Sequence, residues 1–353
     1  MRLLNAMLSR FVEKGTLRVI DAGGALHSYG GGNGPEVTLR LHDAKLERTL
    51  LFKPELKIGE AYMDGSLTVE EGTIRDLLLI FAINRDNLRA QPLQKALRGA
   101  SKRLRAVKLT NTLKRSRANV AHHYDLSNDL YRLFLDDGLN YSCAYFEDPG
   151  QSLEEAQLAK LRHIAAKLDL APGQRVLDIG CGWGSMALYM AKVMDVEVLG
   201  VTLSEEQLEL ARERAKAAGL DGRVRFELLD YRALGESFDR IVSIGMFEHV
   251  GVGRHLEFFN KVRDLLTDDG VALLHSIGRS GAPAPVMPWL RKYIVPGSYS
   301  PAMSETFAAV ELSGLRVTDV EILRRHYAET LLHWSKRFGE NRAEAAELFD
   351  ERF

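Results

Sequence analysis

Two different patterns of apolar and polar positions divide the chain. In the first part, apolar residues recur at helical spacing over residues 3–12, which predicts an amphipathic helix. A compact apolar helix is predicted at 73–84. Between these helices, short alternating segments predict strands at 17–20, 37–41 and 49–51. Residues 1–118 are therefore expected to form a smaller α+β domain.

From about residue 119 the pattern changes to a regular alternation of strands and helices. An amphipathic helix is predicted at 153–168, and apolar strands are predicted at 175–179, 197–203, 224–228, 239–244 and 271–275. Helices are predicted at 185–194, 204–218 and 255–266. This alternation indicates an α/β domain with a doubly wound, mostly parallel sheet over residues 119–353. Ligands of such sheets bind beyond the carboxyl ends of the strands.

Composition narrows the class of protein. The 353 residues are 46% apolar and 27% charged, which allows each domain its own core. The net charge of -1 argues against an electrostatic partner for the whole chain. The longest apolar run, 77–83, is far shorter than the roughly 18–20 residues that span a bilayer. Two cysteines, both inside motifs, and the lack of a signal-peptide core predict a cytoplasmic protein.

One segment is strongly basic. Nine lysines and arginines and no acid lie between Lys95 and Arg117. A solvated helix face or linker is the ordinary interpretation of such a run. Attraction to anionic lipid headgroups, worth ~1 kcal/mol per basic residue, is the functional one. Binding of nucleic acid is not predicted, because no aromatic interleaving or recognition motif accompanies the charges.

The strongest candidate for a ligand site is the sequence LDIGCGWG at 177–184, where a predicted strand meets a predicted helix. Glycines let the backbone approach a ligand, and the following helix N-terminus favours negative charge. The glycine spacing and the lack of an acid at the end of the next strand differ from the dinucleotide fingerprint. Asp178 is placed to interact with a cationic amino-acid head group, while Gly180 and Gly182 let the backbone approach. The alternative is a tight turn without a ligand.

The ends of the next two strands carry further candidates. Thr202 ends its strand and is the better ligand candidate there, because Ser204 and Gln207 form a capping box with a structural explanation of its own. Asp230 follows the strand at 224–228 and could accept a hydrogen bond from an adenine amino group. Tyr231 could contact the same ligand or simply pack.

A second polar group is expected at the same edge of the sheet. Glu248 lies just past one strand and His275 ends another, so both can face one cavity. No metal is predicted, since a ligand set with short, regular spacing is absent, and a hydrogen-bonded polar cluster is favoured. The aromatic segments at 122–129 and 139–146 are candidates for a lid. Cys143, taken alone, is typical of a small buried apolar residue.

Five motifs in order carry a family resemblance. They are HYDLSN at 123–128, YSCAYF at 141–146, LDIGCGWG at 177–184, GMFEHVG at 245–251 and LLHSIG at 273–278. Together they resemble the cyclopropane-fatty-acyl-phospholipid synthase family, which includes the mycolic acid cyclopropane synthases. The segment GEAYMDG at 59–65 is similar to the extra N-terminal domain of the phospholipid-acting branch. The resemblance implies a Rossmann-like class I methyltransferase fold.

The resemblance also implies a reaction, in which a methylene passes from S-adenosylmethionine to a cis double bond of a phospholipid acyl chain. A bound bicarbonate ion would act as the base. Glu248 would accept a hydrogen bond from its hydroxyl, and His275 and Tyr327 would donate to its oxygens. The site residues implied are Cys143, Glu248, His275, Tyr327 and the backbone of Ile277. Tyr327 lies outside the dense motifs, so ordinary packing is its alternative.

The cofactor contacts implied by the resemblance are Tyr141, Ser142, Asp178, Gly180, Gly182, Thr202, Gln207, Asp230 and Tyr231. The implied partners are a phospholipid membrane surface and unsaturated acyl chains. A homodimer, and peripheral association with the inner face of the membrane through the N-terminal domain, are expected by analogy. Apolar residues around 283–301 are candidates for an acyl tunnel or for ordinary core.

Two other functions are carried as alternatives. One is a methyltransferase that adds a methyl group to a lipid alkene or a small amine without ring closure. The implied anion site of Cys143, Glu248, His275 and Tyr327 argues for ring closure. The other is a catalytically silent lipid-binding protein, which the intact glycine loop argues against.

Overall fold

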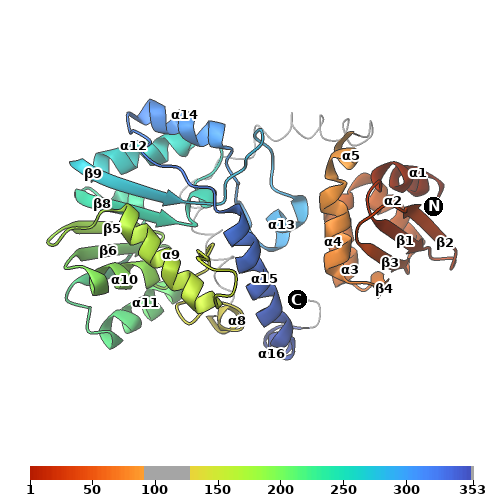
Figure 1. Ribbon diagram of the computed structural model, residues 1–353, viewed down its shortest axis with the longest axis horizontal. Coiled ribbons are helices and arrows are strands. Elements are labelled where there is room, and N and C mark those ends of the chain that lie inside the picture. Colours follow the sequence, from red (N-terminus) through yellow and green to blue (C-terminus); the bar gives the residue numbers. More distant parts are fainter. Residues whose placement is uncertain (91–127, 351–353) are drawn as a thin grey trace. The chain divides into compact units, whose positions relative to one another are not determined.

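The computed structural model describes residues 1–90 and 128–350, which fall into two compact units (Figure 1). The first unit contains residues 1–90 together with Met287–Ile294, and the second contains the other described residues. The basic segment at 95–117, most of the 122–129 motif and the predicted domain boundary lie outside the described residues.

The first unit is an α+β fold, as predicted. Its four-stranded sheet has the order β2-β1-β3-β4, in which β1 and β3 are parallel and the outer pairs are antiparallel. The strands are β1 (Thr16–Ile20), β2 (Leu26–Gly30), β3 (Glu36–Leu41) and β4 (Leu67–Glu71). The helices are α1 (Arg2–Phe11), α2 (Ala44–Phe52), α3 (Pro54–Met63), α4 (Ile74–Ile83) and α5 (Arg85–Ala90). One hydrophobic cluster, which includes Phe11, Leu17 and Ile80, joins helices and sheet.

One predicted strand is wrong. Residues 49–51 lie in α2, which begins at the N-cap Asp43, whose carboxylate accepts from the backbone of Lys45. Leu46, Leu50 and Leu51 are buried, a spacing that belongs to a helix. A window of three residues is too short to separate the two periods. The helices predicted at 3–12 and 73–84 are confirmed by α1 and α4.

The second unit confirms the doubly wound, parallel sheet. Its strands are β5 (Arg175–Ile179), β6 (Glu197–Thr202), β7 (Val224–Leu228), β8 (Phe238–Ile244) and β9 (Leu266–His275), in the order β7-β6-β5-β8-β9. All four strand pairs are parallel. The helices are α8 (Asn128–Arg132), α9 (Leu153–Lys167), α10 (Ser185–Val193), α11 (Glu205–Ala217), α12 (His255–Leu265), α14 (Met303–Ser313), α15 (Arg324–Glu340) and α16 (Arg342–Leu348). Two 3-10 turns, η1 (Tyr231–Ala233) and η2 (Phe247–His249), follow β7 and β8.

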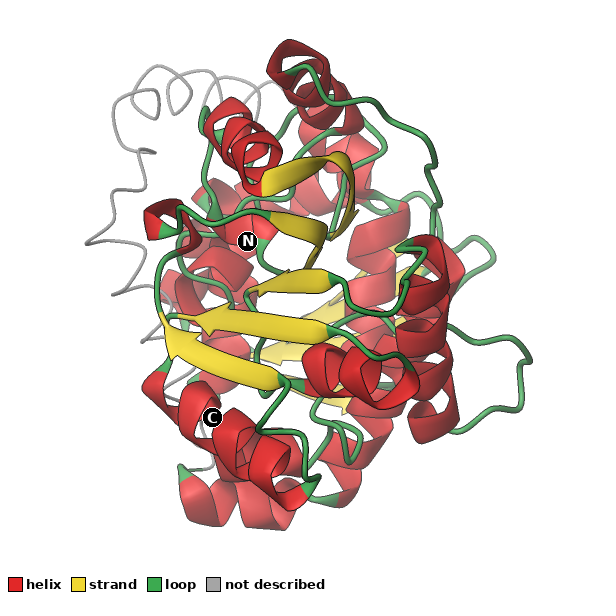
Figure 2. Ribbon diagram, turned by 90° about the vertical axis from the view of Figure 1, so that its left-hand side faces the viewer, coloured by secondary structure: helices red, strands yellow, loops and turns green. Residues whose placement is uncertain are grey.

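Helices cover both faces of this sheet (Figures 1 and 2). One hydrophobic cluster joins α9, α10 and α11 to the sheet, and a second joins α12 and α14 to it. The chain runs outward from β5 through β6 to β7 and then resumes at β8 on the other side of β5. This reversal opens a crevice at the carboxyl ends of β5 and β8, where ligands bind in such sheets. Among the described helices, none combines the length and the apolar character needed to cross a membrane.

A short helix, α13 (Pro288–Tyr293), belongs to the first unit although it follows the sheet in sequence. It packs on α3, where a Cβ atom at Gly59 would lie 2.4 Å from Cδ1 of Trp289. Lys292 and Tyr293 both donate to the carboxylate of Glu60, at 2.6 and 3.0 Å. The motif at 59–65 therefore anchors α13, whose residues were candidates for an acyl tunnel.

Candidate active site

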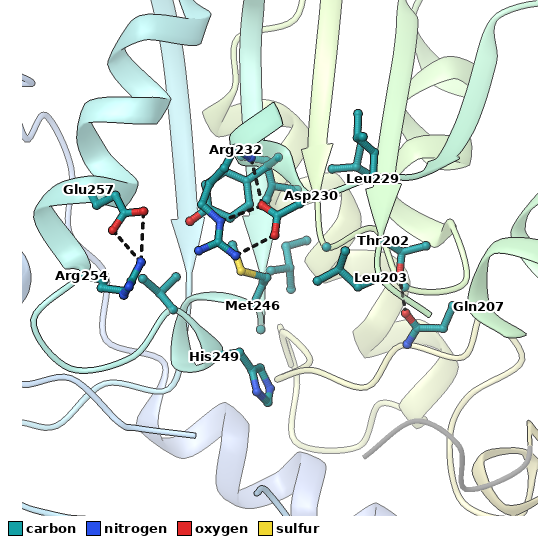
Figure 3. A pocket seen from close by; sticks show the side chains of 18 residues that line it. Thr202, Leu203, Gln207, Leu229, Asp230, Arg232, Met246, His249, Arg254 and Glu257 are labelled. Carbon is teal, nitrogen blue, oxygen red and sulfur yellow. Dashed lines mark hydrogen bonds and ion pairs between the residues drawn. The ribbon is translucent and has the colours of Figure 1, made fainter. Parts of the chain in front are cut away.

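Two adjoining pockets lie at the carboxyl ends of β5, β6 and β8. They share Gly180, Gly182, Gln207, Ile244 and Gly245. We call the first the Asp230 pocket, which is also lined by Thr202, Met246 and His249 (Figure 3). Tyr231 lines it as well. The second, the Asp178 pocket, is also lined by Tyr141, Ser142, Lys160 and Cys181.

The glycine loop is held firmly against β6. The amides of Gly180 and Cys181 both donate to the carbonyl of Val201, at 2.9 and 3.1 Å. A Cβ atom at Gly180 would lie 2.8 Å from Cβ of Met246. Gly182 differs, because no described atom outside its chain neighbours lies within 4 Å of its Cβ position, and its φ is +55°. The tight turn against Met246 therefore requires glycine at position 180, whereas glycine at position 182 leaves space beside both pockets.

Asp178 ends β5 with only 2% of its surface exposed. Its Oδ2 is buried and has no hydrogen-bond partner among the described residues. Burial raises the pKa of Asp178 to about 7, against the opposing effect of Lys160. A buried carboxylate without a partner is costly, and a cationic ligand group would offset that cost. This environment supports the predicted contact with a cationic amino-acid head group.

The Thr202 turn is a helix cap with one difference from the prediction. Ser204 caps α11, since its hydroxyl accepts from the Gln207 amide at 3.3 Å. A full capping box would have the Gln207 side chain return to Ser204. Instead, Oε1 of Gln207 accepts from the Thr202 hydroxyl at 2.9 Å (Figure 3). Gln207 thereby lies along both pockets.

Asp230 has a partner that the sequence patterns did not single out. Nε and Nη2 of Arg232 donate to its two oxygens at 2.8 and 2.6 Å (Figure 3). The carboxylate expected to meet an adenine amino group is thus already bound to a guanidinium. Tyr231 lines the pocket and also packs on Phe258, with ring centroids 5.6 Å apart.

Glu248 is a second buried acid with an unpartnered oxygen among the described residues, and it lines neither of the two pockets. It lies in η2 and is 5% exposed. Its Oε1 accepts from the Ile277 amide, while Oε2 is buried without a hydrogen-bond partner in the described part of the chain. Burial raises the pKa of Glu248 to about 7. The Ile277 amide, which the resemblance assigned to the bound anion, is engaged by Glu248 in the structure.

Tyr327 interacts electrostatically with Glu248, Cys143 and Tyr141. Burial raises the pKa of Tyr327, and these three groups raise it further. Burial also raises the pKa of the Cys143 thiol to about 11. Both side chains are therefore neutral donors at pH 7. The Tyr327 ring also packs edge-on against Trp334, so packing and a site role coexist.

His275 is the last residue of β9. Its Nδ1 is buried and lacks a hydrogen-bond partner within residues 1–90 and 128–350. Burial, with a smaller effect of Lys160, lowers the pKa of His275 to about 4, so the imidazole is neutral at pH 7. No group of three or more potential metal ligands gathers among the described residues.

The 139–146 segment is fixed between two helices. The Ala144 amide donates to the Thr330 hydroxyl of α15 at 3.0 Å. The Tyr141 ring stacks on Trp334 of the same helix, 5.2 Å away. From α9, Lys160 donates to the Ser142 hydroxyl at 3.0 Å. These contacts place Tyr141 and Ser142 along the Asp178 pocket, and their contact with the cofactor stays a prediction.

The sequence patterns did not single out Lys160. It occupies the buried face of α9 with Ala156, Gln157 and Ile164. A lysine and a glutamine three positions apart on an otherwise apolar helix face are unusual, because such residues are seldom fully buried. These two polar residues on an apolar face were the feature of the sequence that could have pointed to Lys160 as a site residue.

This fold, with a glycine loop and an acid at the switch point of a parallel sheet, defines a class I S-adenosylmethionine-dependent methyltransferase. The profile of the mycolic acid cyclopropane synthetase family matches residues 111–353, and that of a domain of unknown function matches residues 3–91. The chain belongs to the mycolic acid cyclopropane synthetase family.

Individual relatives agree with this assignment. The chain is 39% identical to cyclopropane-fatty-acyl-phospholipid synthase of Escherichia coli (strain K12) over 89% of this chain and 80% of that one. It is 35% identical to a probable fatty acid methyltransferase of Pseudomonas putida over 91% of this chain and 81% of the relative. A crystal structure of mycolic acid cyclopropane synthase CmaA1 complexed with SAH and CTAB aligns with a TM-score of 0.63 at 37% identity. The alignment covers 67% of this chain and 87% of that chain.

Proposed function

We propose that this enzyme transfers a methylene from S-adenosylmethionine to a cis double bond of phospholipid acyl chains, forming a cyclopropane ring, with bicarbonate as the base. The observation that carries the proposal is Glu248, a buried carboxylate with one oxygen unpartnered among the described residues, which interacts electrostatically with Tyr327. The likeness to the E. coli cyclopropane-fatty-acyl-phospholipid synthase supports the same acceptor.

The reaction makes definite demands on the site. The π electrons of the alkene form a bond to the methyl carbon while the carbon–sulfur bond breaks, which leaves a carbocation on the acyl chain. A proton must then leave the added methyl group so that the ring can close. An alkene has no proton to remove beforehand, so the site must orient it closely and exclude water. It must accept a proton only after the transfer. Aromatic rings such as Tyr141 and Trp334, stacked 5.2 Å apart, suit the sheltering of a cation.

The residues present fit a small anion that carries a hydroxyl. Bicarbonate would supply the oxygen that takes the proton. Oε2 of Glu248 can accept a hydrogen bond from a hydroxyl, and the neutral Tyr327 can donate to an oxygen. The Cys143 thiol donates to the Ala144 carbonyl at 3.2 Å, so it would have to turn away from that carbonyl to donate to the anion. His275 can donate when its buried Nδ1 carries the proton. In this arrangement the Ile277 amide orients Glu248 through their hydrogen bond and acts on the anion only indirectly.

A phospholipid acceptor requires contact with a membrane surface, which we include in the proposal. Three apolar side chains of α4 support it, because Leu78, Leu79 and Ile83 are 55%, 41% and 44% exposed. Such residues can enter the boundary between headgroups and acyl chains. Sedimentation with anionic vesicles should carry down the wild-type protein and much less of the Leu78→Ser/Leu79→Ser variant. Equal sedimentation of both would contradict this contact. The homodimer and the inner face of the membrane remain predictions.

The test of the reaction uses vesicles of an anionic phospholipid with cis-monounsaturated chains, incubated with S-adenosylmethionine with and without bicarbonate. Mass spectrometry and proton NMR of the released fatty acids should show one added CH2, loss of the alkene and dependence on bicarbonate. An added CH2 with the alkene retained would instead establish methyl transfer without ring closure, which the P. putida relative's name favours. No added mass, with the cofactor still bound, would contradict both.

A further inference from the structure

Lys160 is a buried cation whose two hydrogen-bond acceptors in the described part of the chain are both neutral. It is 2% exposed, and its Nζ donates to Oδ1 of Asn140 at 2.9 Å and to Oγ of Ser142 at 3.0 Å. Both acceptors are neutral, and the acids Asp136 and Asp178 act on the ammonium through their charges. These two bonds use two of its three N–H groups. A buried ammonium in this state is costly unless a ligand completes its surroundings.

Asp178 is the matching anion on the wall of the same pocket. Lys160 and Asp178 both line the Asp178 pocket, and each is 2% exposed. They interact electrostatically, yet Oδ2 of Asp178 has no hydrogen-bond partner in the described residues. Two opposite charges that face one cavity without pairing suit a ligand that carries both signs close together.

From this geometry we infer that Lys160 binds the α-carboxylate of S-adenosylmethionine, while Asp178 receives its α-ammonium group. This rests on the cofactor of the proposed function and adds a residue that the family resemblance did not assign. The amino-acid end of the cofactor is a zwitterion, so it can satisfy both buried charges at once. The hydrogen bonds to Asn140 and Ser142 hold the ammonium at the pocket wall before the cofactor arrives.

The rival explanation gives Lys160 a purely structural role. Gln157, one turn earlier on α9, donates to the carbonyls of Asn140 and Ser142 at 3.2 and 3.0 Å. Asp136 accepts from the Asn140 side chain at 2.7 Å, so a negative charge lies behind that amide. Lys160 could simply complete this network. The two roles differ in what they predict for a ligand that lacks the carboxylate.

The experiment compares S-adenosylmethionine with its decarboxylated analogue by titration calorimetry on the full chain. The wild-type protein should bind the analogue roughly ten- to a hundred-fold more weakly, which is the usual effect of losing one charged hydrogen bond. Lys160→Met should weaken the cofactor by a similar factor and leave the analogue unchanged or slightly tighter, because a positive charge is removed. Lys160→Arg should recover part of the cofactor affinity.

Lys167→Met is the matched control. Lys167 lies two turns along the same helix and pairs at the surface with Asp319 and Glu321, so both ligands should bind as they do to wild type. Equal weakening of both ligands in Lys160→Met would overturn the inference and assign Lys160 to the loop network. If Lys160→Met does not fold, equal affinity of the wild-type protein for the two ligands overturns it as well. These binding results do not depend on any lipid product, so failure of the cyclopropanation assay is a separate outcome.

Discussion

Two buried glutamates, one in each unit, differ in how their carboxylates are paired. Glu60 in α3 is 7% exposed and accepts hydrogen bonds from Lys57, Lys292 and Tyr293, which lower its pKa to about 2. Glu248 is 5% exposed, and burial raises its pKa to about 7. The first carboxylate joins α3 to α13 and has a structural role. The second keeps one oxygen unpartnered among the described residues, which is the state of a group waiting for a ligand.

Two other ionisable groups of the second unit resemble Glu248 in this respect. Asp178 and His275 each have a buried polar atom without a hydrogen-bond partner in the described chain. Burial lowers the pKa of Lys160 to about 8. Hydrogen-bond pairing therefore distinguishes buried charges with a structural role from candidate ligand-binding charges better than the exposed fraction does. The following experiments are arranged to break or sharpen that distinction.

The largest effect is expected from Glu248→Gln. This change keeps the shape of the side chain and removes its acceptor charge, so turnover should fall roughly 10²- to 10⁴-fold, the range of a lost acid–base contribution. Affinity for S-adenosylmethionine, measured by calorimetry, should stay near wild type. The matched variant Glu60→Gln should keep its turnover per folded molecule. A Glu248→Gln enzyme with normal turnover, or one that loses cofactor affinity, would contradict the assigned role.

The two glutamates should also give opposite pH dependences of the free energy of unfolding. The raised pKa of Glu248 disfavours its charged form in the folded state, so stability is fully present below about pH 4.5 and is lost as pH rises to about 7. The loss is on the order of 3 kcal/mol. The lowered pKa of Glu60 stabilises the fold above about pH 4.5, and that stability is lost as pH falls towards 2.

Denaturant melts of the ligand-free protein from pH 3 to pH 8 measure both effects. Glu248→Gln should flatten the decline between pH 4.5 and 7, with the part due to Asp178 remaining. Glu60→Gln should flatten the acid side only. Identical pH profiles for wild type and Glu248→Gln would show that the carboxylate is better solvated than its burial indicates.

Smaller effects are expected from two glycine substitutions, one at a packed position and one beside the pockets. A Cβ atom at Gly200 would lie 2.6 Å from Cδ1 of Phe226, so Gly200→Ala should cost ~1–3 kcal/mol of unfolding free energy. Gly182→Ala meets open space and should cost only the ~1–2 kcal/mol of its left-handed backbone. Its methyl group enters the pockets, however, so cofactor affinity should drop more than in Gly200→Ala. Thermal melts and calorimetry on both variants test this, and unchanged cofactor binding by Gly182→Ala would place the ligand elsewhere.

The smallest effect is expected from Lys292→Met. Its side chain is 55% exposed, and Lys57 still pairs with Glu60, so the loss should be within ~0.2–1 kcal/mol. Cofactor affinity should not change. A loss of several kcal/mol in denaturant melts would mean that Glu60 depends on this one partner, and that α13 carries more of the first unit's stability than its exposed ion pair suggests.

Local patterns were enough to predict most of the second unit. Each of its five strands lies within a residue or two of the predicted range at its carboxyl end, because a buried parallel strand is a continuous apolar run bounded by turn residues. The glycine loop was recognisable for the same reason, since its turn, strand and helix are contiguous in sequence. The first unit was harder to predict. Its short edge strands and α2 have weak periodicity, and the residues at 49–51 read equally well as either element.

The sequence by itself determined which groups could do chemistry, and only the tertiary structure decided which of them are left unpaired. Glu60 and Glu248 look alike along the chain, but Glu60 meets Lys292, 232 residues away, and Glu248 meets no cation among the described residues. Lys160 meets neutral oxygens beside Asp178, 18 residues further along the chain. Charge pairing depends on distances of a few ångströms between segments far apart in sequence, and no local pattern encodes those distances.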